Sequence, residues 1–173
     1  MGNTGKYLAI ISAFVVILTV LLSLAIPALF SWYDFTISGG GYSSGLYLTP
    51  FGTFIVNDYG SPDETVGLVL IGGIMVLTGA GLCIAGVVKE MKVLGIIGGI
   101  LMIFGPTMLI YGLSGQVSDF AQTMNLIATT YDGNIFYHNF NPSPGVSVIL
   151  GIYYGYVIVY AGGILGLIGG ASI

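Results

Sequence analysis

The sequence predicts a membrane protein of the all-α class, a bundle of four transmembrane helices that carries a small β-sheet cap outside the membrane. Hydrophobic residues make up 55% of the 173 residues and charged residues only 6%, with a mean hydropathy of +1.00. Typical soluble domains contain about 25% charged residues. Four apolar runs are long enough to cross a hydrocarbon core of about 30 Å, which takes about 20 helical residues. The spans of this single membrane domain, 1–173, are predicted at 7–30, 66–88, 93–113 and 146–170.

The second, third and fourth spans share glycines that recur every seven residues. On a helix of about 3.6 residues per turn this spacing drifts by only ~20° per step, so each span presents one glycine stripe. Glycine inside a helix costs roughly 1 kcal/mol relative to alanine, and close contact between helix backbones favours it in lipid. We therefore predict packing within the bundle, with dimerisation through a lipid-facing stripe as the alternative. The predicted packing glycines are Gly72, Gly79, Gly86, Gly98, Gly105, Gly112, Gly155, Gly162 and Gly169.

The charged residues predict the orientation of the bundle in the cell membrane. The only basic residues are Lys6, before the first span, and Lys89 and Lys92, at the ends of the inner turn 89–92. The positive-inside rule places these positions, and with them both termini, in the cytoplasm. The opposite loops carry six acids and no Lys or Arg, which disfavours binding of nucleic acid there. The six acids are Asp34, Asp58, Asp63, Glu64, Asp119 and Asp132.

The first span, 7–30, is predicted to end or kink at Pro27. Aromatic residues follow it, as expected at a membrane interface. A cleaved signal peptide is the alternative, with the small residues Ser23 and Ala25 at the cleavage site. The apolar run is longer than the core of a usual signal peptide, which favours a retained helix.

The first outer loop, 31–65, is predicted to be rich in β-strand. Trp32 to Ile37 alternates large and polar residues, 38–44 is a Gly/Ser turn, and 46–56 mixes β-branched with aromatic residues. That pattern is typical of two or three strands joined by a hairpin. A second turn and the cap of the second helix are predicted at 57–63 and at Ser61 or Asp63.

The third span, 93–113, is predicted to continue outward as one helix to about residue 130, because no strong helix breaker follows Gly115. One face of this extension should pack on the strands of the first outer loop. Its apolar residues follow three- and four-residue spacing, at Val117, Phe120, Met124 and Ile127. The second outer loop, 114–145, is also predicted to contain a strand at 135–137 and a break before the fourth helix at 141–145.

The four spans contain no Asp, Glu, Lys, Arg or His, which argues against a pump, a proton-coupled transporter or a voltage sensor. His138 is the only histidine, so it is predicted to be a loop residue rather than a catalytic or metal-binding one. Cys83 has no partner for a disulfide and is predicted to pack as a small apolar residue. The outer acids could hold calcium, but solvated side chains and helix caps explain them more simply. We therefore predict a protein that is not an enzyme and has no cofactor or metal.

Trp32 is followed thirteen residues later by Gly45, Leu46 and Tyr47. This arrangement, in the first outer loop of a four-span chain, resembles the claudin-like tetraspan superfamily, which carries a tryptophan, then Gly-Leu-Trp and two cysteines in that loop. The resemblance implies a left-handed four-helix bundle under an antiparallel sheet built from both loops, with an elongated third helix. The chain departs from the pattern at Tyr47, in both missing cysteines and in a longer second loop, so the junction-forming role of claudins is not transferred.

The functional prediction is an accessory or structural subunit, or a lateral-interaction protein of the adhesion type. Its predicted partners are the lipid bilayer and either other membrane proteins or a second copy of the chain. An acidic surface without arginine suits an archaeal-like protein in an acidic medium. The residues predicted to contact a partner at the cap are Trp32, Tyr33, Gly45, Leu46 and Tyr47.

Two alternative functions use other residues. A lipid- or quinone-binding accessory subunit of a redox complex would need an aromatic pocket at the outer interface, for which the candidates are Trp32, Tyr111, Tyr153 and Tyr156. A pore-forming oligomer would need a continuous polar path. The hydroxyl residues available for such a path are scattered, at Ser12, Thr19, Thr78 and Thr107.

Overall fold

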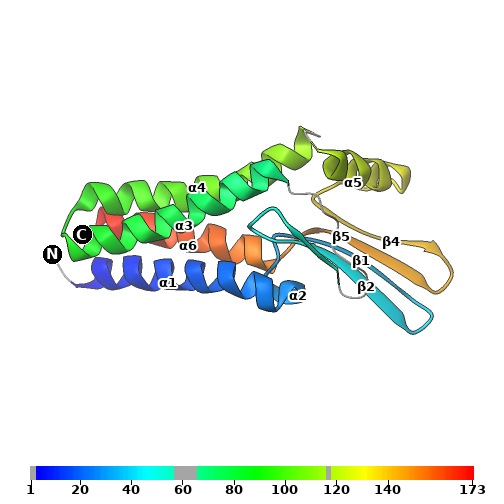
Figure 1. Cartoon of the computed structure of the whole chain (residues 1–173), viewed down its shortest axis with the longest axis horizontal. Coiled ribbons are helices and arrows are strands. Elements are labelled where there is room, and N and C mark those ends of the chain that lie inside the picture. Colours follow the sequence, from blue (N-terminus) through cyan, green and yellow to red (C-terminus); the bar gives the residue numbers. More distant parts are fainter. Residues whose placement is uncertain (1–2, 57–65, 116–117) are drawn as a thin grey trace.

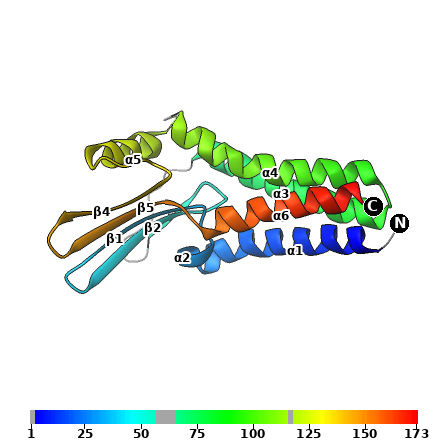
Figure 2. The same ribbon diagram turned by 180° about the vertical axis from the view of Figure 1, so that it is seen from behind.

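A helical bundle with a β-sheet at one end makes up the computed structural model, which describes residues 3–56, 66–115 and 118–173 (Figure 1). Four helices of 18 to 23 residues are long and apolar enough to cross a membrane. At 1.5 Å per residue they extend about 27–35 Å, which matches a hydrocarbon core. The first of them begins, and the last ends, at the end of the bundle away from the sheet (Figure 2). They are α1 (Thr4–Ala25), α3 (Gly67–Val88), α4 (Lys92–Ser114) and α6 (Tyr154–Ala171).

The buried positions of the bundle hold many small residues, whereas large apolar residues cover its outside. α1 packs on α3 and α6, and α4 packs on the same two helices, so the four helices form a ring. In α1, Ala9 and Ala13 are fully buried, while Ile11 and Phe14 are 60% and 62% exposed. This distribution suits lipid, because hydrocarbon chains solvate large apolar side chains and close packing is what holds the helices together.

The prediction that Pro27 ends or kinks the first helix is confirmed. α1 ends at Ala25, and a short helix, α2 (Pro27–Phe30), begins at the proline. Proline cannot donate a hydrogen bond to the preceding turn, but it fits the first turn of a new helix. At the other end of α1, Lys6 forms an ion pair with Glu90 in the turn between α3 and α4, and this hydrogen bond lowers the pKa of the Glu90 carboxyl.

The cap is a five-stranded antiparallel sheet with the strand order β3-β2-β1-β5-β4. β1 is central, and it pairs with β2 from the first loop and with β5 from the later part of the chain. The prediction that both loops contribute strands to one sheet is confirmed. The predicted turn at 57–63 and the caps Ser61 and Asp63 lie outside the described residues. The strands are β1 (Tyr33–Gly39), β2 (Tyr42–Leu48), β3 (Phe54–Val56), β4 (Tyr137–Ser143) and β5 (Val146–Ile152).

The predicted fourth span, 146–170, is wrong in its first seven residues, which form β5 rather than helix. A continuous apolar run does not by itself distinguish a buried strand from a buried helix. Strand pairing decides the outcome, because every residue of β1 from Tyr33 to Gly39 has a partner in β5. α6 begins only at Tyr154, and its 18 residues are still long enough to cross a membrane. The all-α class is therefore incomplete, since the cap takes up a larger share of the chain than predicted.

The strand predicted at 135–137 is displaced, because β4 begins at Tyr137 and continues to Ser143. The segment 141–145, predicted as a break before the fourth helix, is instead the end of β4 and the turn into β5. Gly145 makes this turn with a φ of 80°, a conformation that glycine adopts readily. Pro142 is tolerated in β4 because this strand lies at the edge of the sheet, where an amide hydrogen is not required for pairing.

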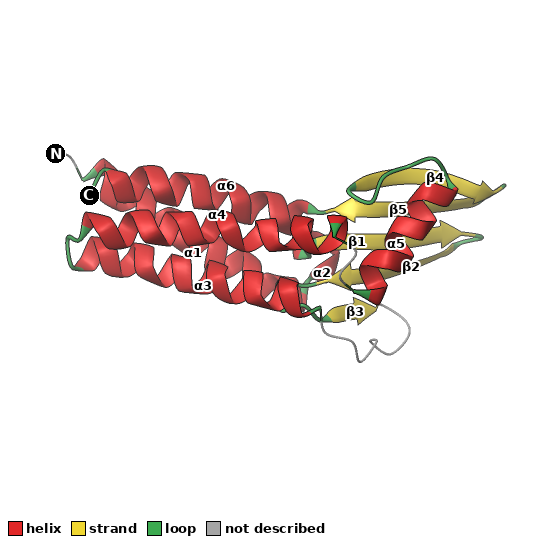
Figure 3. Ribbon diagram, turned by 90° about the horizontal axis from the view of Figure 1, so that it is seen from above, coloured by secondary structure: helices red, strands yellow, loops and turns green. Residues whose placement is uncertain are grey.

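The prediction of one continuous third helix to residue 130 is wrong. α4 ends at Ser114, and a separate helix, α5 (Asp119–Thr130), crosses one face of the sheet (Figure 3). Ser118 caps α5, and its Oγ accepts a hydrogen bond from Ala121 N at 3.1 Å. α4 tilts away from the sheet at its outer end (Figure 1), so a straight extension would carry its apolar face into water. The change of direction returns that face to the strands.

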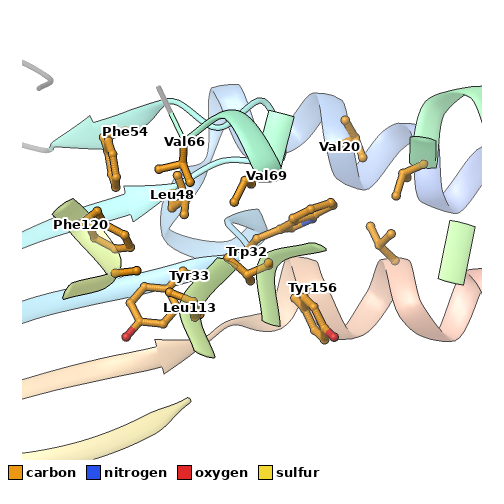
Figure 4. Close-up of a cluster of buried hydrophobic side chains, with 14 of the residues drawn as sticks. Val20, Trp32, Tyr33, Leu48, Phe54, Val66, Val69, Leu113, Phe120 and Tyr156 are labelled. Carbon is orange, nitrogen blue, oxygen red and sulfur yellow. The ribbon is translucent and has the colours of Figure 1, made fainter. Parts of the chain in front are cut away.

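The apolar face predicted for this region packs on the sheet, as expected. Phe120 and Met124 are buried, and Ile127 packs against the same core. Val117 lies outside the described residues. Figure 4 shows Phe120 close to Phe54 and Tyr33. The centroid of the Phe120 ring lies 5.6 Å from that of the Tyr33 ring, in an edge-on arrangement, and 4.7 Å from that of the Phe54 ring.

We expect Phe120→Ala to lower the free energy of unfolding by about 3 kcal/mol, because it leaves a cavity where α5 meets the sheet. Leu126→Ala in the same helix is the control, since Leu126 is 66% exposed and should change stability by less than about 0.5 kcal/mol. Unfolding in detergent with increasing SDS measures both values, and hydrogen exchange should locate the loss in α5 and the strands beneath it. Equal effects of the two variants would contradict this packing.

Candidate functional site

The first two residues predicted to contact a partner lie in the core between the bundle and the cap (Figure 4). Trp32 and Tyr33 are both fully buried. Trp32 packs edge-on against Tyr156 of α6, with ring centroids 6.4 Å apart. Tyr33 Oη donates a hydrogen bond to Ile135 O at 2.7 Å. Burial raises the pKa of the Tyr33 hydroxyl, and the neighbouring Asp34 adds a smaller effect in the same direction. These two side chains join the sheet to the bundle and offer no surface to a partner.

Two buried polar atoms at this junction, Ser31 Oγ and Trp32 Nε1, have no hydrogen-bond partner among the described residues. A buried polar atom without a partner costs about 1–3 kcal/mol. The sequence does not mark them, because a serine and a tryptophan beside a membrane interface are ordinary there. Tight packing of the indole ring must offset this cost, which makes the ring, rather than its N–H, the stabilising part of Trp32.

The other three predicted contact residues belong to β2 and point to both faces of the sheet. Leu46 packs against the core on the face that α5 covers. Tyr47 lies on the opposite face and is only 6% exposed. Its ring lies over Gly45, because a Cβ at Gly45 would collide with the hydroxyl and ring atoms of Tyr47. Glycine at position 45 is therefore required for the tyrosine to lie flat along the strand.

We call the sheet face opposite α5 the open face, because α5 is the only helix among the described residues that crosses the sheet (Figure 3). One row of paired residues runs across it, from β2 to β4, and contains Tyr47, Asp34, Gly151 and Tyr137. Tyr137 is 64% exposed. The row thus sets one acidic side chain between two tyrosines, with a glycine beside it.

A notch of about 50 Å³ opens on this face beside Asp34. Gly151 forms its floor, since it places no side chain between Asp34 and Tyr137. Tyr153, the residue before α6, also lines the notch, together with Ile149, Leu150 and Ile152. The notch therefore lies at the end of the sheet nearest the bundle.

Asp34 is the one carboxylate among the described residues that is buried, with 6% of its surface exposed. Thr36 Oγ1 donates a hydrogen bond to its Oδ1 at 2.6 Å. Burial raises the pKa of Asp34, and the hydrogen bond from Thr36 opposes that rise. Burial also raises the pKa of Tyr153, with further contributions from Asp34, Tyr154 and Tyr47. In the sequence Asp34 is one of six outer acids, and only its position inside a predicted strand sets it apart.

The raised pKa of Asp34 predicts that acid stabilises the cap. A carboxyl whose pKa is higher in the folded state contributes most stability below its unfolded value, about 3.9, and that contribution is lost as pH rises through the folded value. We expect Asp34→Asn to match the wild type near pH 3 and to melt at a higher temperature at pH 7, because the amide carries no charge to desolvate. Thermal melts in detergent across this range test it; a wild type that is more stable at pH 7 than the variant would contradict it.

The predicted packing glycines lie where helices meet. A Cβ at Gly79 would lie 2.6 Å from Gly98 O, and one at Gly98 would lie 2.5 Å from Gly79 O. Gly72 and Gly105 form the same kind of reciprocal contact, and Gly112 is buried in α4. Gly86 approaches Gly95, whereas Gly155, Gly162 and Gly169 approach Phe30, Val16 and Ala9. The stripe on α6 therefore faces the bundle rather than lipid, and the amount by which these contacts stabilise the fold stays a prediction.

Only some of the residues named for the two alternative functions lie close together. Tyr153 N donates a hydrogen bond to Trp32 O at 3.1 Å, and Trp32 contacts Tyr156, but Tyr111 is 64% exposed on α4. Among the hydroxyl residues considered for a polar path, Ser12, Thr19 and Thr107 each donate a hydrogen bond to a backbone carbonyl of their own helix. Thr78 is exposed.

The remaining sequence candidates have local partners. His138 Nε2 lies 3.0 Å from Tyr131 O, and its ring stacks on Phe140. Cys83 Sγ donates to Gly95 O at 3.5 Å inside the bundle. Among the described residues no group of three or more His, Cys, Asp or Glu could hold a metal ion, and Asp58, Asp63 and Glu64 lie outside them.

Comparison of the chain with family models and with curated proteins finds no match.

Proposed function

We propose that this protein is a non-enzymatic membrane protein that acts as an accessory or lateral-interaction subunit and contacts another membrane protein through the open face of its cap. The observation that carries this proposal is the unequal covering of the sheet. α5 packs its apolar residues on one face, and no other described helix crosses the opposite face, which exposes Tyr137 at the end of a row whose other members are buried. Exposed tyrosines are enriched in protein interfaces, because they bury a large area and keep a polar group for hydrogen bonding.

The orientation belongs to this proposal. The three lysines favour a cytoplasmic position for both termini and a cap outside the cell membrane. α1 begins and α6 ends at one end of the bundle, and Lys6 pairs there with Glu90 of the α3–α4 turn, which supports a common side for all basic residues. We also propose the left-handed, claudin-like architecture. A sheet that combines strands of both loops supports it.

Site-specific photocrosslinking tests the proposed surface. A benzophenone amino acid replaces Tyr137 on the open face, and Leu126 on the outer side of α5 in a control chain; both side chains are about 65% exposed, at 64% and 66%. We expect a crosslinked membrane protein, identified by mass spectrometry, in membranes of the source cell from the Tyr137 chain only. A partner captured equally at both positions, or at neither, would overturn the assignment of the open face.

A further inference from the structure

The notch beside Asp34 combines features of a site for an organic cation. One buried carboxylate supplies the charge, and Thr36 is its only side-chain hydrogen-bond partner among the described residues. An ionised carboxylate has about four acceptor positions, so it can accept further hydrogen bonds from a ligand. Tyr137 and Tyr153 line the same notch, and aromatic rings attract organic cations.

The size and donor set of the notch favour one kind of cation. A cavity needs roughly 10–15 Å³ to hold one water molecule, so about 50 Å³ admits an ammonium group and the carbon behind it. Calcium takes six to eight oxygen ligands and magnesium an octahedral set, whereas this notch offers one carboxylate. A primary ammonium can donate hydrogen bonds to Asp34, which a trimethylammonium group cannot do.

The position of the notch indicates where such a group comes from. Tyr153 immediately precedes α6, so it lies at the boundary of the proposed hydrocarbon core. Gly151, the floor, lies in β5 two residues before Tyr153 and farther from α6, a separation of roughly 7 Å at 3.3 Å per residue. The headgroup layer extends about 5–7 Å beyond the core on each side. The notch therefore lies at the depth of lipid headgroups.

Charge complementarity points the same way. Lys6 and the lysines of the α3–α4 turn lie at the far end of the bundle, so no Lys or Arg of this chain competes for Asp34. We propose that the notch formed by Asp34, Gly151, Tyr137 and Tyr153 binds the primary ammonium of an aminophospholipid headgroup of the ethanolamine type. This site depends on the helices crossing a membrane, but it does not depend on the accessory role, and loss of a protein partner would leave it unchanged.

Lipid binding to the purified full chain tests the proposal. The chain is held in a lipid-free nonionic detergent and titrated with phosphatidylethanolamine, phosphatidylcholine or phosphatidylglycerol, each with the same acyl chains, and native mass spectrometry gives the Kd. We expect phosphatidylethanolamine to bind roughly tenfold or more tightly than the other two, because only its headgroup forms a charge-assisted hydrogen bond with Asp34. Equal affinities for the ethanolamine and choline lipids would overturn the proposal.

Variants separate this notch from general attraction to an acidic cap. Asp34→Asn should weaken ethanolamine-lipid binding to the level of the choline lipid, whereas Asp132→Asn, which removes an exposed acid elsewhere on the cap, should bind as the wild type does. Tyr137→Ala should weaken it several-fold and serves if Asp34→Asn does not fold, because Tyr137 is 64% exposed. Binding unchanged in Tyr137→Ala, or in a folded Asp34→Asn, would overturn the site.

A soluble amine provides the last arm of the experiment. Free ethanolamine has the same ammonium group but no acyl chains, so we expect it to compete with the lipid only at a concentration far above the lipid Kd. Competition at equal concentration would show that the notch takes a soluble amine or the lysine of a partner, and would overturn its assignment to lipid.

Discussion

Gly79→Leu is expected to lower the free energy of unfolding by about 3 kcal/mol or more, because it forces two helix backbones apart. The added Cβ would meet Gly98 O at 2.6 Å and Met102 N at 2.9 Å. Both are backbone atoms of α4, so no side-chain rotation can relieve the contact. Reversible unfolding in mixed micelles with increasing SDS measures the loss, and the midpoint should fall well below that of the wild type.

Gly81→Leu is the matched control, two residues along the same helix. A Cβ at Gly81 meets nothing within 4 Å, and the residue is exposed on the outside of α3. The substitution should be neutral or slightly stabilising, since leucine has the higher helix propensity. Gly105→Leu should behave like Gly79→Leu, because its Cβ would lie 2.5 Å from Gly72 O. Wild-type unfolding of Gly79→Leu and Gly105→Leu would contradict the packing role of the glycines.

Trp32→Ala is expected to cost about 3–5 kcal/mol by leaving a large cavity between the bundle and the sheet. The indole is fully buried and packs against Tyr156 (Figure 4). Hydrogen exchange should rise most strongly in β1 and at the start of α6. The residues just before these two elements are joined by a hydrogen bond from Tyr153 N to Trp32 O. The bundle itself should remain helical, because the glycine contacts lie elsewhere.

Trp32→Phe distinguishes the ring from its N–H group. It keeps an aromatic ring in place and removes Nε1, which has no partner among the described residues. We therefore expect Trp32→Phe to cost much less than Trp32→Ala. If the two variants lost equal stability, the N–H would have to take part in an interaction, and the ring packing described above would not account for the role of this residue.

The bundle could be predicted from the sequence because membrane spans leave a direct compositional signal. The second and third spans begin and end within one residue of their prediction, and the first, predicted at 7–30, is divided at Pro27 into α1 and the short α2. The first loop was predictable as well, since alternation and a Gly/Ser turn mark a hairpin within one segment. The glycine stripe likewise depends on local spacing alone.

The cap was predicted less well where distant segments decide the structure. Val146–Ile152 is apolar enough for a helix, and only pairing with β1, more than a hundred residues earlier, makes it a strand. The end of α4 at Ser114 and the separate α5 follow from the position of the sheet, which the helix pattern does not contain. Trp32 and Tyr33 carried signals for an interface, but their burial depends on α5 and α6 covering them.

Local sequence patterns are sufficient to predict four apolar helices of membrane length, glycine stripes on three of them, and strands in the loop after the first helix. Each of these depends on neighbours along the chain or on the solvent that a side chain prefers. Three features depend on the three-dimensional arrangement instead: β5 completes the sheet, α5 turns back across it, and Asp34 and Gly151 form a notch. These features arise from hydrogen bonds and contacts between segments far apart in the chain, and short-range spacing does not encode which segments meet.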